Sequence, residues 1–97
     1  MKGVRIMKEK ELYVLKYVNE KINGNDDVEY NCDIEEEYAV KEIAHYLKRL
    51  ISKGYIRGRN WAMINGEEVS VYKNKVFSIY YEKLVLTKNG REEINKK

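Results

Sequence analysis

The chain has 97 residues, of which 43% are apolar and 36% are charged, and its formal net charge is +3. This length predicts a single domain over residues 1–97, because each of two half-sized cores would bury too little apolar surface to fold. No apolar run reaches the about 20 residues that span a bilayer, and the N-terminal stretch lacks the apolar centre of a signal peptide, so we expect a cytoplasmic protein with no membrane partner. With one cysteine, Cys32, and one histidine, His45, we expect no internal disulfide, no metal site and no cofactor.

The positive charge is unevenly distributed along the chain. Residues 1–34 hold six Lys and Arg against seven Asp and Glu, and residues 35–54 hold four against four. Residues 55–97 hold nine against five, so the whole positive excess lies in this last segment.

The first expected helix covers about residues 8–23. Its apolar residues recur at roughly helical spacing, and they are Leu12, Val14, Leu15, Val18 and Ile22. The run stops at the turn-forming sequence GNDD. For the stretch that follows, residues 28–33, we expect a loop or a short strand.

The second expected helix runs from Asp33 to Lys53. Asp33 followed by Glu36 fits the Asp variant of a capping box, and Gly54 stands where a helix commonly ends in a left-handed residue. One apolar face is formed by Val40, Ile43, Ala44, Leu47, Leu50 and Ile51. The opposite face carries Lys41, His45, Lys48 and Ser52.

Strand-like patterns follow Gly54. Asn65-Gly66 lies between AMI and EEVSVY and predicts a two-residue hairpin turn. A second turn at residues 73–75 leads into VFSIYY and KLVL, which we expect to add a third strand. Thr87 then predicts the cap of a short closing helix through Ile94.

This order of elements predicts an α+β fold: a winged helix-turn-helix with a two- to three-stranded antiparallel wing and a short C-terminal helix. In that fold Gly54 lets the chain reverse, and the following residues return to the core. Arg57 and Arg59 then emerge at the root of the wing, on the same side of a strand because they alternate.

The pattern L-x-x-L-x-x-x-G-Y-I at residues 47–56, with L-T-x-x-G-x-x-x-I at residues 86–94, resembles bacterial winged-helix proteins. The stretch from Ile34 to Leu47, which begins IEEEY, followed by GYI and LTKNG, is similar to the YjcQ-like family of small, often phage-borne bacterial proteins. This resemblance covers residues 34–60 and 84–95, and the insert from Trp61 to Tyr81 does not align to it. It implies a winged-helix fold and nucleic-acid binding, as in a transcription regulator, but no known enzymatic activity.

A winged helix usually places the N-terminal part of its second helix in the major groove of DNA. Here Glu35, Glu36, Glu37 and Glu42 crowd those turns, where phosphates repel carboxylates. We therefore expect duplex DNA to contact basic side chains farther along the helix and on the wing. These candidate DNA-binding residues are Lys41, His45, Lys48, Arg49, Arg57, Arg59, Lys73 and Lys75. A competing interpretation of Lys48 and Arg49 is pairing with acidic neighbours on the helix, such as Glu42.

The aromatic residues leave a second function open, a winged helix that binds a protein partner and no DNA. The insert contains Trp61, Tyr72, Phe77, Tyr80 and Tyr81, which either pack across strands or form an interface, with a homodimer as the expected assembly. Tyr13 and Tyr17 on the first helix are a further candidate surface. We expect no enzyme, because the sequence has no phosphate-binding glycine loop, carboxylate pair or nucleophile motif, and His45 and Cys32 lack catalytic companions.

Overall fold

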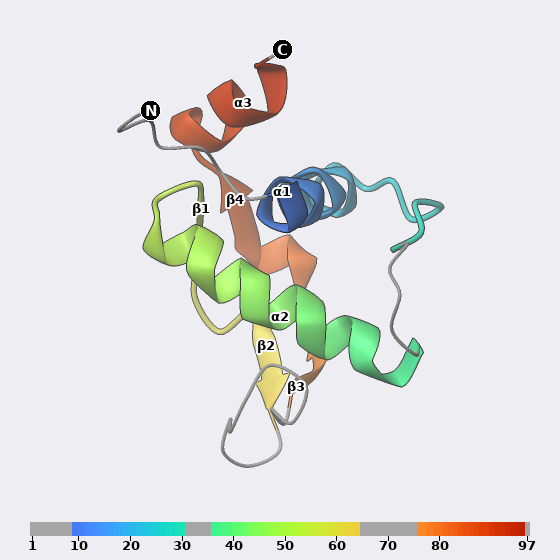
Figure 1. Ribbon diagram of the computed structural model, residues 1–97. Coiled ribbons are helices and arrows are strands. Elements are labelled where there is room, and N and C mark those ends of the chain that lie inside the picture. Colours follow the sequence, from blue (N-terminus) through green and yellow to red (C-terminus); the bar gives the residue numbers. More distant parts are fainter. Residues whose placement is uncertain (1–8, 31–35, 65–75, 97) are drawn as a thin grey trace.

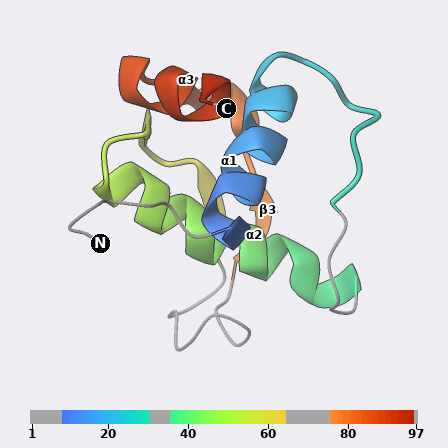
Figure 2. The ribbon, with the colours of Figure 1, turned by 45° about the horizontal axis from the view of Figure 1, so that its top comes forward.

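The computed structural model describes residues 9–30, 36–64 and 76–96. The described chain is α+β, and its elements follow in the order helix, helix, two strands, two strands and helix, with one 3-10 turn before the last strand. α1 crosses α2, the strands lie beside them, and α3 lies near the C-terminal end of α1 (Figures 1 and 2). None of the described helices is long and apolar enough to cross a membrane.

α1 spans Glu9–Ile22, close to the predicted helix over 8–23. It buries Val14, Leu15 and Val18 completely, as the helical spacing of its apolar residues predicts. After the helix, Gly24 has a φ of 88° and the amide of Asn25 donates to the carbonyl of Glu20 at 2.9 Å. These features form a Schellman end, in which a glycine takes the left-handed conformation that other residues avoid.

α2 spans Glu36–Ser52, and the predicted capping residue Asp33 lies outside the described residues. Its buried face holds Ile43, Ala44, Leu47 and Leu50, which confirms the predicted stripe. The helix ends as the sequence predicts: Gly54 has a φ of 86°, and the Tyr55 amide donates to the Leu50 carbonyl at 2.9 Å. This second Schellman end turns the chain directly into the first strand.

The strands form two antiparallel pairs that continue one another. β1 (Ile56–Gly58) pairs with β4 (Leu84–Leu86), and β2 (Ala62–Ile64) pairs with β3 (Val76–Ile79). Between the pairs, the Tyr80 amide donates to the Trp61 carbonyl at 2.6 Å. The two chain segments therefore run as one bent antiparallel ribbon, with β2 and β3 at its far end (Figure 1).

This ribbon corrects one prediction. The segment predicted as one third strand contains two strands, β3 and β4, separated by the 3-10 turn η1 (Tyr81–Lys83). At this break the amide of Lys83 donates to the Tyr80 carbonyl at 3.0 Å, and the chain then continues along the ribbon as β4, which pairs with β1. The predicted turns at Asn65-Gly66 and at residues 73–75 lie outside the described residues, as does EEVSVY.

α3 spans Lys88–Asn95, and Thr87 caps it as predicted. The Thr87 hydroxyl accepts from the Gly90 amide at 3.0 Å and lies 2.7 Å from the Gly54 carbonyl oxygen. One side chain thus ties the start of α3 to the end of α2. The shared core lies between α1, α2 and the strands, where Ile56, Val76, Ile79, Leu84 and Leu86 join the helical residues.

Candidate nucleic-acid interface

The C-terminal half of α2 bears a basic hollow of about 420 Å³. Among the described residues, its lining consists of His45, Lys48, Arg49, Ser52 and Lys53. The structure therefore brings three of the predicted DNA-binding residues, His45, Lys48 and Arg49, to one place. It adds Lys53, which the sequence indicated only as the end of the second helix. Lys41 lies one turn before His45 on the same helix and is partly buried.

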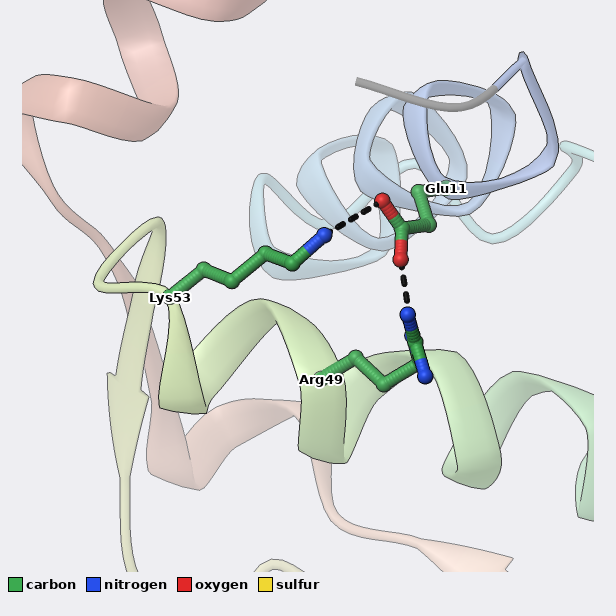
Figure 3. A network of polar contacts seen from close by, with 3 residues as sticks. All are labelled: Glu11, Arg49 and Lys53. Atoms are coloured by element: carbon green, nitrogen blue, oxygen red, sulfur yellow. Dashed lines mark hydrogen bonds and ion pairs between the residues drawn. The ribbon is translucent and has the colours of Figure 1, made fainter. Parts of the chain in front are cut away.

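The buried carboxylate of Glu11 holds two of these cations. The Arg49 Nε donates to Glu11 Oε2 at 2.7 Å and the Lys53 Nζ donates to Glu11 Oε1 at 2.9 Å (Figure 3). The Glu11 side chain is fully buried, whereas those of Arg49 and Lys53 are 42% and 43% exposed. Both cationic groups are thus fixed in direction by α1 while they remain accessible to solvent.

The hollow keeps positive charge despite this pairing. Within the part of the chain that the structure describes, its lining holds the cations Lys48, Arg49 and Lys53 and no carboxylate, and Glu11 beneath it compensates one charge of the Arg49 and Lys53 pair. Burial raises the pKa of the Glu11 carboxyl, but the hydrogen bonds and charges of Lys53 and Arg49 outweigh it and hold this pKa below its usual value. Glu11 is therefore ionised at neutral pH and Arg49 keeps a defined orientation.

One of the two interpretations of Arg49 in the sequence was an ion pair with an acidic neighbour on its own helix. In the structure the partner of Arg49 is instead Glu11 on α1. The signal was present in the sequence: Glu11 stands three and four residues before Val14 and Leu15 and therefore lies on the buried face of the first helix. A carboxylate on a buried face needs cationic partners from the element that covers it.

Glu42 also departs from its prediction as an exposed carboxylate that would repel phosphates. The Glu42 side chain is only 3% exposed. It accepts a hydrogen bond from the Tyr30 hydroxyl, and the Lys10 Nζ donates to it at 3.4 Å. α1 covers this side of α2, so the charge of Glu42 is compensated within the helix crossing. The side chains of Glu35, Glu36 and Glu37 are outside the described set.

The ribbon supplies the second group of predicted contacts. Arg57 lies in β1 opposite Val85, and both Arg57 and Arg59 are exposed. Neither arginine has an ion-pair partner within residues 9–30, 36–64 and 76–96. β1 ends at Gly58, so the strand alternation that was expected to align the two arginines covers Arg57 alone.

The remaining candidate residues either lie outside the described part of the chain or pack against the core. Lys73, Lys75 and Tyr72 lie outside the described residues, and so does Cys32. Trp61 and Tyr81 are partly buried and pack against the core, and Tyr81 does so from the turn η1 and not from a strand. Tyr13 and Tyr17, the further candidate surface on the first helix, also pack against the core. Their ring centres lie 5.3 and 5.1 Å from that of Tyr30, so the two side chains are not fully exposed.

Replacing Glu11 by glutamine is expected to lower the free energy of unfolding by about 2 kcal/mol at neutral pH, because two charge-assisted hydrogen bonds lose their anionic acceptor. The pKa of the Glu11 carboxyl is lower in the folded than in the unfolded chain. The stabilisation by this ion pair is therefore complete at pH values above the unfolded-state pKa, and it is lost as the pH falls through the folded-state pKa. Urea unfolding across the acid range measures it. Glu9→Gln, at an exposed position of the same helix turn, is the control, and equal stability of both variants at pH 7 would contradict this role of Glu11.

Comparison with known proteins adds no assignment to this site. No protein-family model matches the chain, and no curated protein or solved structure is significantly similar to it.

Proposed function

We propose that the chain is a winged-helix domain that binds duplex DNA through the basic hollow of α2 and the arginines of the adjoining ribbon, as a small transcription regulator does. The observation that carries this proposal is the hollow itself. It gathers Lys48, Arg49 and Lys53 on an accessible helix surface, with no carboxylate among the described residues that line it. Such a surface has the charge and the size to neutralise backbone phosphates.

The order of the elements supports the same function. α2 passes through its Schellman end directly into β1, and Arg57 and Arg59, in β1 and just after it, are exposed. A winged helix uses the same succession of a groove-binding helix and a β-hairpin wing. The exposed cations of helix and ribbon are therefore separated by only a few residues of chain.

The supporting geometry favours phosphate contacts over base readout. The eight described residues that follow α1, residues 23–30, are not helical, whereas a helix-turn-helix turn has about three to four residues. The proposal accordingly rests on α2 and the ribbon and not on a regular helix-turn-helix pair. The cations of the hollow, Lys48, Arg49 and Lys53, lie in and just after the C-terminal half of α2. In the proposed complex this half of the helix therefore faces the phosphate backbone of the duplex.

We expect the double variant Arg57→Ala/Arg59→Ala to bind a mixed-sequence duplex about tenfold more weakly than the native chain at low salt, because two phosphate contacts are lost. Fluorescence anisotropy of a labelled duplex measures the affinity. The matched control is Lys16→Ala/Lys88→Ala, which removes the same net charge from exposed positions on α1 and α3. Equal weakening in both double variants would show that only net charge matters and would contradict a defined interface.

A second candidate function, protein binding without DNA, is favoured by one observation. Val85 in β4 is 52% exposed beside a hollow of about 420 Å³ between the C-terminal end of α1, β4 and α3. A dimer that Val85→Glu dissociates in sedimentation equilibrium, together with absent duplex binding, would select this function over the first.

A further inference from the structure

A separate cavity of about 550 Å³ lies on the other half of α2 from the basic hollow. Its described lining comes from α1, the segment before α2, α2 itself and η1, and consists of Tyr17, Glu29, Tyr30, Ala39, Val40, Ile43 and Tyr81. This volume is within the usual range of small-molecule sites, about 300–1,000 Å³. The proposed contacts with DNA use none of these residues.

Three tyrosine rings line this cavity, and that of Tyr17 stands at a steep angle to each of the other two. The ring of Tyr17 is 5.1 Å from that of Tyr30 at an interplanar angle of 72°, and 6.4 Å from that of Tyr81 at 74°. Burial raises the pKa of both the Tyr17 and the Tyr81 hydroxyl, so these rings stay protonated and neutral. Rings set nearly perpendicular present negative faces in different directions, an arrangement that suits a compact cation.

Ammonium groups of the chain already approach the same rings. The Lys21 Nζ lies 5.8 Å from the Tyr17 ring centre and 5.9 Å from that of Tyr81. The Lys10 Nζ lies 5.9 Å from the Tyr30 ring centre, and its charge is balanced by Glu42 at 3.4 Å. The aromatic cluster therefore attracts cations in this structure, at the distance where cation-π attraction acts.

The rest of the lining defines which cation fits. Ala39, Val40 and Ile43 provide an apolar wall from α2, and the exposed carboxylate of Glu29 adds a negative charge. An apolar wall favours methyl groups over a strongly hydrated ammonium, while the carboxylate disfavours anions. We propose that this cavity binds a small organic cation of the quaternary-ammonium class.

The test is a titration of the native chain with choline and, separately, with its neutral isostere, in which a tert-butyl group replaces the trimethylammonium group. Chemical shifts of the cavity residues report binding. We expect choline to bind saturably and about tenfold more tightly than the isostere, because only the cation gains from the ring faces and from Glu29. Equal affinities, or shifts that never saturate, would overturn the proposal.

Variants of single residues locate the bound cation on the chain. Glu29→Gln is expected to weaken choline binding several-fold and leave the isostere unchanged, whereas Glu82→Gln, at an exposed position beside Tyr81, leaves both unchanged. Tyr81→Phe keeps the ring and is expected to keep the preference for choline. Lys21→Met removes the competing ammonium and is expected to tighten choline binding. Loss of the preference in Tyr81→Phe, or an equal effect of the two glutamate variants, would place the ligand elsewhere and contradict the proposal.

Discussion

Replacing Leu47 by alanine is expected to lower the free energy of unfolding by about 3 kcal/mol. Leu47 is completely buried on α2, in the cluster that joins the residues of α1 to those of the strands. Its removal leaves a void within this cluster, and neighbouring side chains relax only partly into such a void. In a domain of this size the midpoint of thermal unfolding should fall by roughly 10–20 °C.

The matched control for Leu47→Ala is Val85→Ala. Val85 is 52% exposed on β4, so its truncation should change the free energy of unfolding by less than about 0.5 kcal/mol. Urea unfolding followed by circular dichroism compares the two variants. Similar small losses in both would mean that Leu47 is not at the centre of the core.

Replacing Gly90 by alanine is expected to destabilise the fold by about 2 kcal/mol, although alanine normally favours a helix over glycine by about 0.5–1 kcal/mol. A Cβ at this position would lie 2.2 Å from the carbonyl oxygen of Tyr55 and 2.8 Å from the Cδ1 of Leu86. The oxygen belongs to the backbone, and it also accepts the Thr87 amide at 3.1 Å. α3 must therefore move away from the end of α2.

Asn89→Ala is the control for Gly90→Ala, because Asn89 is exposed on the same helix one residue earlier. There alanine should leave stability unchanged or raise it slightly, through its higher helix propensity. Thermal unfolding of both variants measures the contrast. A Gly90→Ala chain as stable as the native one would contradict the close approach of α3 to Tyr55.

Helices and their ends were predicted well because the signals are local. The apolar spacing placed the first helix at 8–23 against the observed Glu9–Ile22, and the second to within one residue at its C-terminal end, Ser52. Gly54 was predicted to end the second helix in the left-handed conformation, and Thr87 was predicted to cap the last helix. The structure has the positive φ of Gly54 and the hydrogen bond to the Thr87 hydroxyl. Each of these features depends on residues only a few positions apart in the sequence.

Strand pairing was harder to predict. β1 pairs with β4 across about 30 residues, and no local pattern in IRG identifies LVL as its partner. The break between β3 and β4 depends on the turn η1, whose sequence YEK has no strong turn residue. An apolar and aromatic run was therefore interpreted as one strand where the chain bends and makes two.

The charges of the candidate site were predicted only in part. Periodicity correctly grouped His45 and Lys48 on the outer side of α2, but it could not show that Glu11 would hold Arg49 and Lys53. Glu42 was expected on the exposed side, and the crossing of α1 buries it. Which flank of a helix is covered depends on how two helices cross, and a pattern within one helix does not encode that angle.

The most direct test of DNA binding is the salt dependence of duplex affinity, measured by fluorescence anisotropy between about 50 and 200 mM salt. If the hollow of α2 and the ribbon neutralise several phosphates, the logarithm of the association constant falls steeply and linearly with the logarithm of salt concentration. Lys48→Ala should reduce this slope by about one unit. Absent binding at the lowest salt concentration, or an affinity that salt does not change, would contradict the proposed function.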